Sequence, residues 1–146
     1  MRRIFLSLSL IVLASAFSTH AGDLWQTNFE AAQAQAAKEK KHVLIDFTGS
    51  DWCGWCIKLD EEVFQKPAFK AFAKENLVLV TADFPESKQL PKKLVKQNDA
   101  LAAKYKIEGY PTLVILDSDG KKVGEMGYVE GGPKPFLAQL KDILDK

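Results

Sequence analysis

Cysteine and histidine are scarce in this chain of 146 residues, which contains two of each. The cysteines are Cys53 and Cys56, and the histidines are His20 and His42. A closed zinc site needs four ligands, so this supply argues against structural zinc, and we predict no metal site. A small exported protein that relies on disulfides carries more of them, and the fold must therefore depend on burial of apolar side chains. The cysteine pair is then free for chemistry.

An excess of charge of one sign is also lacking. The sequence has 20 Lys and Arg residues against 19 Asp and Glu residues, a formal net charge of +1. Such a balance provides no electrostatic attraction to nucleic acid or to a membrane surface, so we expect no nucleic-acid partner. A glycine-rich nucleotide fingerprint, internal repeats and low-complexity tracts are missing as well. We therefore expect no nucleotide or flavin cofactor.

The N-terminal segment has the pattern of a secretory signal. A basic start is followed by an uncharged run over residues 4–16 and then by small residues that end at Ala21. The run is too short to span a bilayer comfortably, which favours a signal peptide over residues 1–21 that is cleaved after Ala21, although an uncleaved anchor is the alternative. One domain over residues 22–146 would remain. We expect this domain to be soluble and either periplasmic or secreted.

Short apolar runs rich in branched residues predict buried strands over residues 42–47, 77–83 and 113–116. A strong turn signal at residues 117–120 predicts that the next segment, residues 121–129, returns as an antiparallel partner. All of these predicted strands are expected to belong to the same sheet.

Helical spacing of apolar side chains predicts the remaining elements. The first helix starts at a capping box of Thr27 and Glu30 and ends near Lys40, and a second follows the cysteines. A further helical piece runs from Pro67 to near Asn76. A polar loop over residues 85–97 leads into a helix through Leu94 and Leu101, and the last helix follows Gly131-Gly132-Pro133. The order predicts an α/β sandwich around a mixed sheet, with the first strands parallel and the last hairpin antiparallel.

The cysteines lie where a predicted strand passes into a helix. Unpaired backbone amides and the positive end of the helix dipole at this point favour a thiolate at Cys53 over the thiol. We expect Cys53 to be exposed and reactive and Cys56 to be shielded. A structural bridge or half of a metal site are the alternatives, but a bridge between residues three apart adds little entropic stabilisation. The spacing therefore favours redox chemistry.

The sequence resembles the thioredoxin superfamily in its strand, its Trp52-Cys53-Gly54-Trp55-Cys56 motif, the helix that follows and the later Gly109-Tyr110-Pro111-Thr112 before a strand. The resemblance covers residues 23–146 and implies a thioredoxin-like three-layer sandwich, with a central mixed sheet flanked by helices. Within the superfamily, the signal sequence and the run over residues 49–56 are most similar to secreted bacterial thioredoxin-like proteins of the Dsb type.

The resemblance implies a role for three side chains. Cys53 would attack a substrate disulfide and form a mixed disulfide, and Cys56 would resolve it. Asp46 resembles the buried strand aspartate that assists proton transfer to the resolving cysteine. Burial raises the pKa of a carboxyl group, which would suit it to act as a general base. The loop between Asp46 and Cys53 is one residue longer than in typical thioredoxins. The alignment of Asp46 with Cys56 therefore stays open, and a structural buried acid is the alternative.

The resemblance also implies a substrate-binding surface. Pro111 resembles the cis-proline of the family, with the backbone of Tyr110 pairing with an extended substrate, whereas a trans proline that begins a strand is the alternative. Gly54 lies between the sulfurs in the motif. Trp55 is expected to be an exposed rim residue, and Trp52 is either a rim or a core residue.

We therefore expect an exported thiol–disulfide oxidoreductase that reduces disulfides in extracytoplasmic proteins. Its redox-active cysteine pair would need no cofactor, and an upstream thiol donor, such as a membrane conduit, would supply electrons. Trp55 replaces the proline of cytosolic thioredoxins, and no histidine lies between the cysteines to stabilise the reduced form further. An oxidase or isomerase is one alternative. A non-catalytic binding module, or a pair of sulfurs that holds Cu(I), is another.

Overall fold

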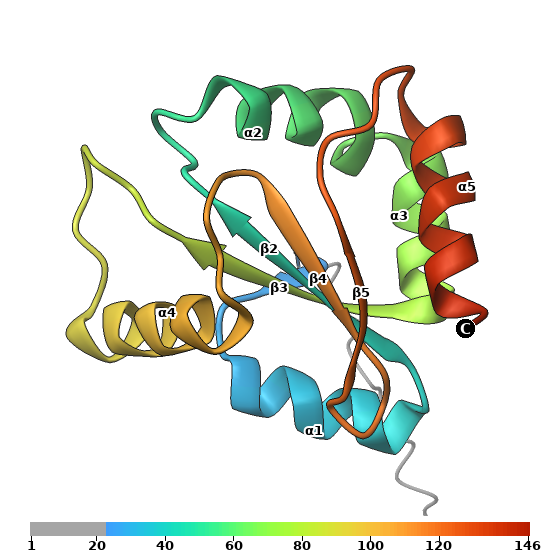
Figure 1. The fold of residues 1–146 in the computed structure, drawn as a ribbon, viewed down its shortest axis with the longest axis horizontal. Coiled ribbons are helices and arrows are strands. Elements are labelled where there is room, and N and C mark those ends of the chain that lie inside the picture. The colour runs from blue at the N-terminus through green and yellow to red at the C-terminus, as the bar shows by residue number, and fades with distance from the viewer. Residues whose placement is uncertain (1–22) are drawn as a thin grey trace, which may run out of the picture.

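A five-stranded mixed sheet forms the centre of the protein (Figure 1). This computed structural model describes residues 23–146, so the predicted signal peptide lies outside the described residues. The strands are β1 (Trp25–Gln26), β2 (His42–Thr48), β3 (Leu77–Asp83), β4 (Thr112–Leu116) and β5 (Lys122–Met126), in the order β1-β3-β2-β4-β5. The first three strands are parallel, and β4 is antiparallel to both β2 and β5. The prediction of a mixed sheet with a final antiparallel hairpin is confirmed.

Helices cover both faces of the sheet (Figure 1). The helices α1 (Phe29–Glu39) and α4 (Lys92–Tyr105) lie on one face, and α2 (Gly54–Leu59), the π-helix η1 (Asp60–Phe64), α3 (Pro67–Asn76) and α5 (Pro133–Leu144) lie on the other. Helices, sheet and helices form the three-layer sandwich that the sequence predicted.

The residues of β2 alternate between the two cores. Leu44 packs with α3 and α5, whereas Val43 and Ile45 pack with α1, and all three are fully buried. Successive side chains of a strand point to opposite faces, so a strand covered on both faces needs an uninterrupted apolar run. This requirement explains why the apolar runs predicted the strands correctly.

Several element boundaries differ from the sequence predictions. The predicted capping box of Thr27 and Glu30 is wrong, because Asn28 is the N-cap of α1 and its side chain accepts a hydrogen bond from the amide of Ala31 at 3.1 Å. The segment predicted as a loop over residues 85–97 is a loop only to Pro91, since α4 begins at Lys92. The strand predicted over residues 121–129 ends at Met126. The two-residue strand β1 is too short to produce a periodic signal.

The helix after the cysteines continues from α2 into η1 without a break. Leu59, Val63 and Phe64 of this helix are all buried. The π-helical turn was not predicted, and such turns occur frequently at functional sites. Its effect here is to continue the helix away from the cysteines while its apolar residues stay in the core.

We expect Gly124→Ala to destabilise the protein. A Cβ atom at Gly124 of β5 would lie 2.6 Å from Cγ2 of Ile143 in α5, too close for the core to accept without moving. Overpacking of this kind lowers the free energy of unfolding by about 1–3 kcal/mol. Urea denaturation measures the change. Gly109→Ala is the control, because nothing lies within 4 Å of a Cβ there. Equal losses in the two variants would contradict the proposed clash.

Candidate active site

Cys53 and Cys56 form a disulfide bond at the start of α2. Cys53 is the N-cap of the helix, and its Sγ accepts a hydrogen bond from the backbone amide of Cys56 at 3.2 Å. The predicted position of the pair at a strand-to-helix junction is confirmed. After reduction, the same amide is placed to stabilise a thiolate at Cys53, because a hydrogen bond to the charged form lowers a thiol pKa.

The expected exposure of Cys53 is wrong for this disulfide-bonded form. Cys53 is 6% exposed and Cys56 is 5% exposed, so burial does not distinguish the two residues. In this form the sulfur of Cys53 is bonded to that of Cys56 and accepts a hydrogen bond from the Cys56 amide, so it lies at the first turn of α2.

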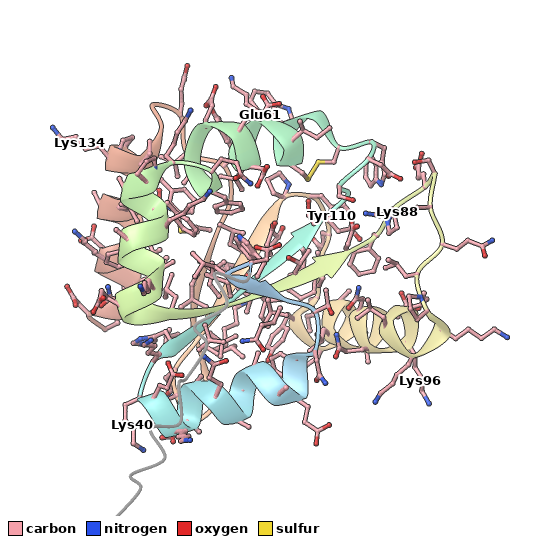
Figure 2. All side chains as sticks on the ribbon, turned by 180° about the vertical axis from the view of Figure 1, so that it is seen from behind. Lys40, Glu61, Lys88, Lys96, Tyr110 and Lys134 are labelled. Atoms are coloured by element: carbon pink, nitrogen blue, oxygen red, sulfur yellow. A yellow bond between two sulfur atoms is a disulfide. The ribbon has the colours of Figure 1, made fainter. Side chains whose placement is uncertain are left out.

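The residues expected to bind substrate gather on the loops around this helix start. The Tyr110–Pro111 peptide bond, just before β4, is cis. The ring of Tyr110 lies edge-on to Trp52, with 5.8 Å between the ring centroids, and 5.4 Å from Phe84. Figure 2 shows Tyr110 at the end of the sheet where the disulfide is drawn as a yellow bond. A Cβ at Gly54 would meet nothing within 4 Å, so the space beside this residue is open.

The two tryptophans of the motif lie at the surface. Trp55 is 58% exposed and Trp52 is 43% exposed, so the core alternative for Trp52 is wrong. Trp52 is fixed at the surface because its Nε1 donates a hydrogen bond to the carbonyl oxygen of Phe84 at 2.8 Å. A Cβ at Gly49 would lie 2.4 Å from the indole of Trp52, so this close approach requires glycine.

Asp46 is the buried acid of the site. It lies in β2, is 8% exposed, and its Oδ1 has no hydrogen-bond partner among residues 23–146. Burial, with smaller contributions from the carboxylates of Asp60 and Asp83, raises the pKa of Asp46 to about 8. Asp46 and Cys56 line the same cavity of about 350 Å³. The longer loop before Cys53 has therefore not separated the Asp46 carboxyl group from this cavity. The catalytic role of Asp46 stays a prediction.

A network missed by the sequence analysis fixes the loop in front of Cys53. The carboxylate of Asp51 accepts hydrogen bonds from the amides of Glu86 and Ser87, at 2.9 and 2.8 Å, and from the hydroxyl of Ser87. These hydrogen bonds lower the pKa of Asp51 to about 2, and the bond from the Ser87 hydroxyl makes the largest contribution. The active-site loop is thus attached to the loop that follows β3. No local sequence pattern identifies this contact, because Glu86 and Ser87 follow Asp51 by 35 and 36 residues.

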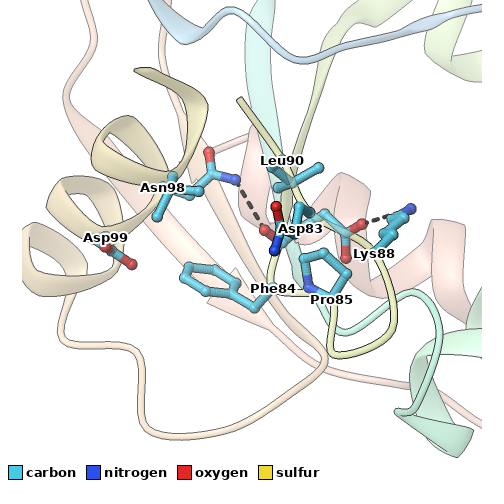
Figure 3. Close-up of a pocket in the computed structure, with 9 residues that line it drawn as sticks. Asp83, Phe84, Pro85, Lys88, Leu90, Asn98 and Asp99 are labelled. Carbon is cyan, nitrogen blue, oxygen red and sulfur yellow. Dashed lines mark hydrogen bonds and ion pairs between the residues drawn. The ribbon is translucent and has the colours of Figure 1, made fainter. Parts of the chain in front are cut away.

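Asp83, at the end of β3, makes the second attachment. Its carboxylate accepts hydrogen bonds from the amide and hydroxyl of Ser50, at 2.9 and 2.6 Å, and forms an ion pair with Lys88 at 3.1 Å. Its backbone carbonyl accepts a hydrogen bond from the buried side chain of Asn98. Figure 3 shows the contacts of Asp83 with Lys88 and Asn98 at a pocket of about 380 Å³. The wall of this pocket is therefore continuous with the active-site loop.

Residues 23–146 lack two kinds of feature. No group of three or more His, Cys, Asp and Glu side chains in this range is arranged to hold a metal ion. In the same range, no helix is both long enough and apolar enough to cross a membrane.

Fold and cysteine pair together define a thiol–disulfide oxidoreductase of the thioredoxin type. Residues 29–144 match the family described as thioredoxin-like domain, and the chain belongs to this family.

Among its relatives, the chain is 37% identical over 120 residues to the disulfide bond reductase DsbH of Chlamydia pneumoniae, a match that covers 82% of this chain and 72% of DsbH. It is 27% identical over 125 residues to the thioredoxin-related protein DsbJ of the same organism, covering 85% of this chain and 36% of DsbJ. A solved structure of DsbH oxidoreductase superposes with a TM-score of 0.80 at 32% identity and covers 95% of both chains.

We expect Asp46→Asn to stabilise the oxidised protein in a pH-dependent way. The pKa of Asp46 is raised from 3.8 to about 8, so the folded chain keeps this proton where the unfolded chain loses it. The stability of the wild type should therefore fall as pH rises from about 4 to about 8, by at most about 1.4 kcal/mol per pH unit, and be regained at lower pH. Asparagine does not titrate. The advantage of the variant should grow from pH 4 to pH 8 and then level off.

Urea denaturation of both proteins between pH 4 and pH 9 measures this difference. Asp142→Asn, at an exposed position of α5, is the control and should show no such trend. A difference between wild type and Asp46→Asn that does not change with pH would contradict the raised pKa.

Proposed function

We propose that this chain is an exported thiol–disulfide oxidoreductase that reduces disulfide bonds in extracytoplasmic proteins. The observation that carries the proposal is the N-cap position of Cys53, whose sulfur accepts the Cys56 amide at 3.2 Å. This geometry stabilises the thiolate that must start the reaction. The 37% identity to a protein named disulfide bond reductase supports the reducing direction.

The reaction transfers two electrons to the substrate. The Cys53 thiolate attacks one sulfur of the substrate disulfide, and the other substrate sulfur leaves as a thiolate. Cys56 then loses its proton and attacks Cys53 Sγ, which closes the Cys53–Cys56 disulfide and releases the reduced substrate. Asp46 would accept the Cys56 proton, and this role is supported by the cavity that both residues line and by a carboxyl pKa of about 8, which allows proton exchange near neutral pH.

The substrate surface proposed here consists of the residues that surround the helix start. The backbone of Tyr110, next to the cis peptide bond to Pro111, would pair with an extended substrate segment. Trp52, Trp55 and the open space at Gly54 would receive the side chains next to the substrate cysteine. Exposed aromatic side chains suit this task because they bury a large area and lose little conformational freedom.

The proposal includes a location and an electron source. Residues 1–21 would direct export and be removed, leaving a soluble domain in the periplasm or outside the cell. Each turnover leaves the protein oxidised, so an upstream thiol donor, a membrane conduit or another thioredoxin-like protein, would restore the Cys53–Cys56 dithiol. The cysteine pair itself would be the redox group.

Substitution of the cysteines tests the assigned roles in an insulin-reduction assay. Cys53→Ser removes the nucleophile and should reduce turnover to the uncatalysed background. Cys56→Ser removes the resolving thiol and should accumulate a mixed disulfide with insulin, detected by mass on a non-reducing gel. Undiminished turnover by Cys53→Ser would rule out the proposed function, and a mixed disulfide in that variant would reverse the two roles.

The reduction potential tests the direction. Equilibration of the pair with glutathione should give a value close to that of thioredoxin, about −270 mV, if the protein is a reductase. A value near −120 mV, which is typical of a strong oxidant, would instead favour an oxidase. The wild-type protein with both cysteines alkylated is the control for reactions of glutathione alone.

A further inference from the structure

Four side chains beside the disulfide form a closed ring of contacts. The ammonium of Lys58 lies 5.1 Å from the centroid of the Trp55 ring and 5.3 Å from that of the Tyr128 ring. The two rings contact each other, with 5.2 Å between their centroids and a tilt of 46°. Both distances from Lys58 are within the range of a cation–π interaction. Trp55 is therefore held from two directions.

Glu62 closes the ring. The hydroxyl of Tyr128 donates a hydrogen bond to Oε2 of Glu62 at 2.5 Å, and Oε1 of Glu62 lies 3.9 Å from the ammonium of Lys58. The contact with Tyr128 and the charge of Glu62 raise the pKa of Lys58 above its ordinary value. Lys58 and Tyr128 thus each contact the three other side chains, and Trp55 and Glu62 each contact two.

The ring joins separate parts of the fold. Trp55 and Lys58 belong to α2, Glu62 belongs to η1, and Tyr128 follows β5. Tyr128 also packs against the hydrophobic core that α3 and α5 share with the sheet. Because its ring is anchored there, Tyr128 can hold Trp55 in place although the indole is 58% exposed.

We propose that Lys58, Glu62 and Tyr128 are positioning residues that hold Trp55 in one orientation beside the cysteine pair, so that its exposed surface receives an apolar side chain next to the substrate cysteine. This inference rests on the proposed function. An exposed side chain that must be ordered on binding reduces affinity, and ordering it in advance removes that loss. The ring of contacts would therefore lower the KM for protein disulfides without changing the chemical step.

Kinetics with a disulfide-linked peptide that has leucine next to its cysteine test the effect on substrate binding. Tyr128→Leu and Lys58→Met should each raise KM about two- to tenfold, with kcat unchanged within about twofold. Tyr128→Phe keeps the ring but loses the contact with Glu62, so its KM should rise less. Lys58→Arg keeps a cation over both rings and should restore the wild-type KM. With serine in place of leucine, the wild type should show a higher KM and the variants little further change.

Lys104→Met is the matched control. Lys104 lies 5.2 Å over the ring of Tyr105 in α4, so this variant loses the same charge and the same kind of contact away from the cysteines. Its KM should equal that of the wild type. An equal rise of KM in Lys104→Met and Lys58→Met, or a fall of kcat with unchanged KM in Tyr128→Leu, would overturn the proposal.

A spectroscopic measurement tests the positioning of Trp55 independently of an enzymatic assay. Labelling with 5-fluorotryptophan gives one ¹⁹F signal for each of the three tryptophans, and Trp55→Phe identifies the signal of Trp55. Tyr128→Leu and Lys58→Met should shift the Trp55 signal and leave those of Trp25 and Trp52 in place. An unchanged Trp55 signal would overturn the positioning role even if KM rises. If the wild type reduces no disulfide while the Trp55 signal shifts as expected, the proposed function fails and the positioning stands.

Discussion

The position of β2 at the centre of the sheet is the constraint on which the rest of the structure depends. The strand is paired on both sides, and Val43, Ile45 and Phe47 are fully buried. A strand held in this way can change neither register nor direction, since a slip of one residue would move every side chain to the opposite face of the sheet, into a core packed for other residues. The carboxyl end of β2 therefore fixes the position of Cys53 at the start of α2. The same strand carries Asp46 toward the cavity that Cys56 lines.

Two aspartates five residues apart show how the surroundings set the chemistry of this region. Asp46 is buried and its Oδ1 has no hydrogen-bond partner in the described part of the chain, so its pKa rises to about 8. Asp51 accepts hydrogen bonds from the loop after β3, so its pKa falls to about 2. The first carboxyl group can exchange a proton near neutral pH, and the second is a permanent anion that fixes a loop. Identical side chains thus differ in pKa because their surroundings differ.

The local sequence determined the fold class and the centre of the site. Uninterrupted apolar runs predicted the three long strands, because a strand covered on both faces has no polar position to interrupt them. The short spacing of Cys53 and Cys56, between such a strand and a helix, predicted the active turn. The later Gly109-Tyr110-Pro111-Thr112 strengthened the family resemblance. The burial of Asp46 was also predictable, since a single acid within an apolar run has no exposed face to occupy.

The contacts between distant segments were decided only by the tertiary structure. Asp51 contacts the loop after β3, and Lys58 contacts Tyr128. The sequence determined which segments are strands and helices, because apolar periodicity is a local property. It did not determine which side chains meet across the packed elements. That choice depends on the relative placement of whole strands and helices, which exists only once the chain has folded.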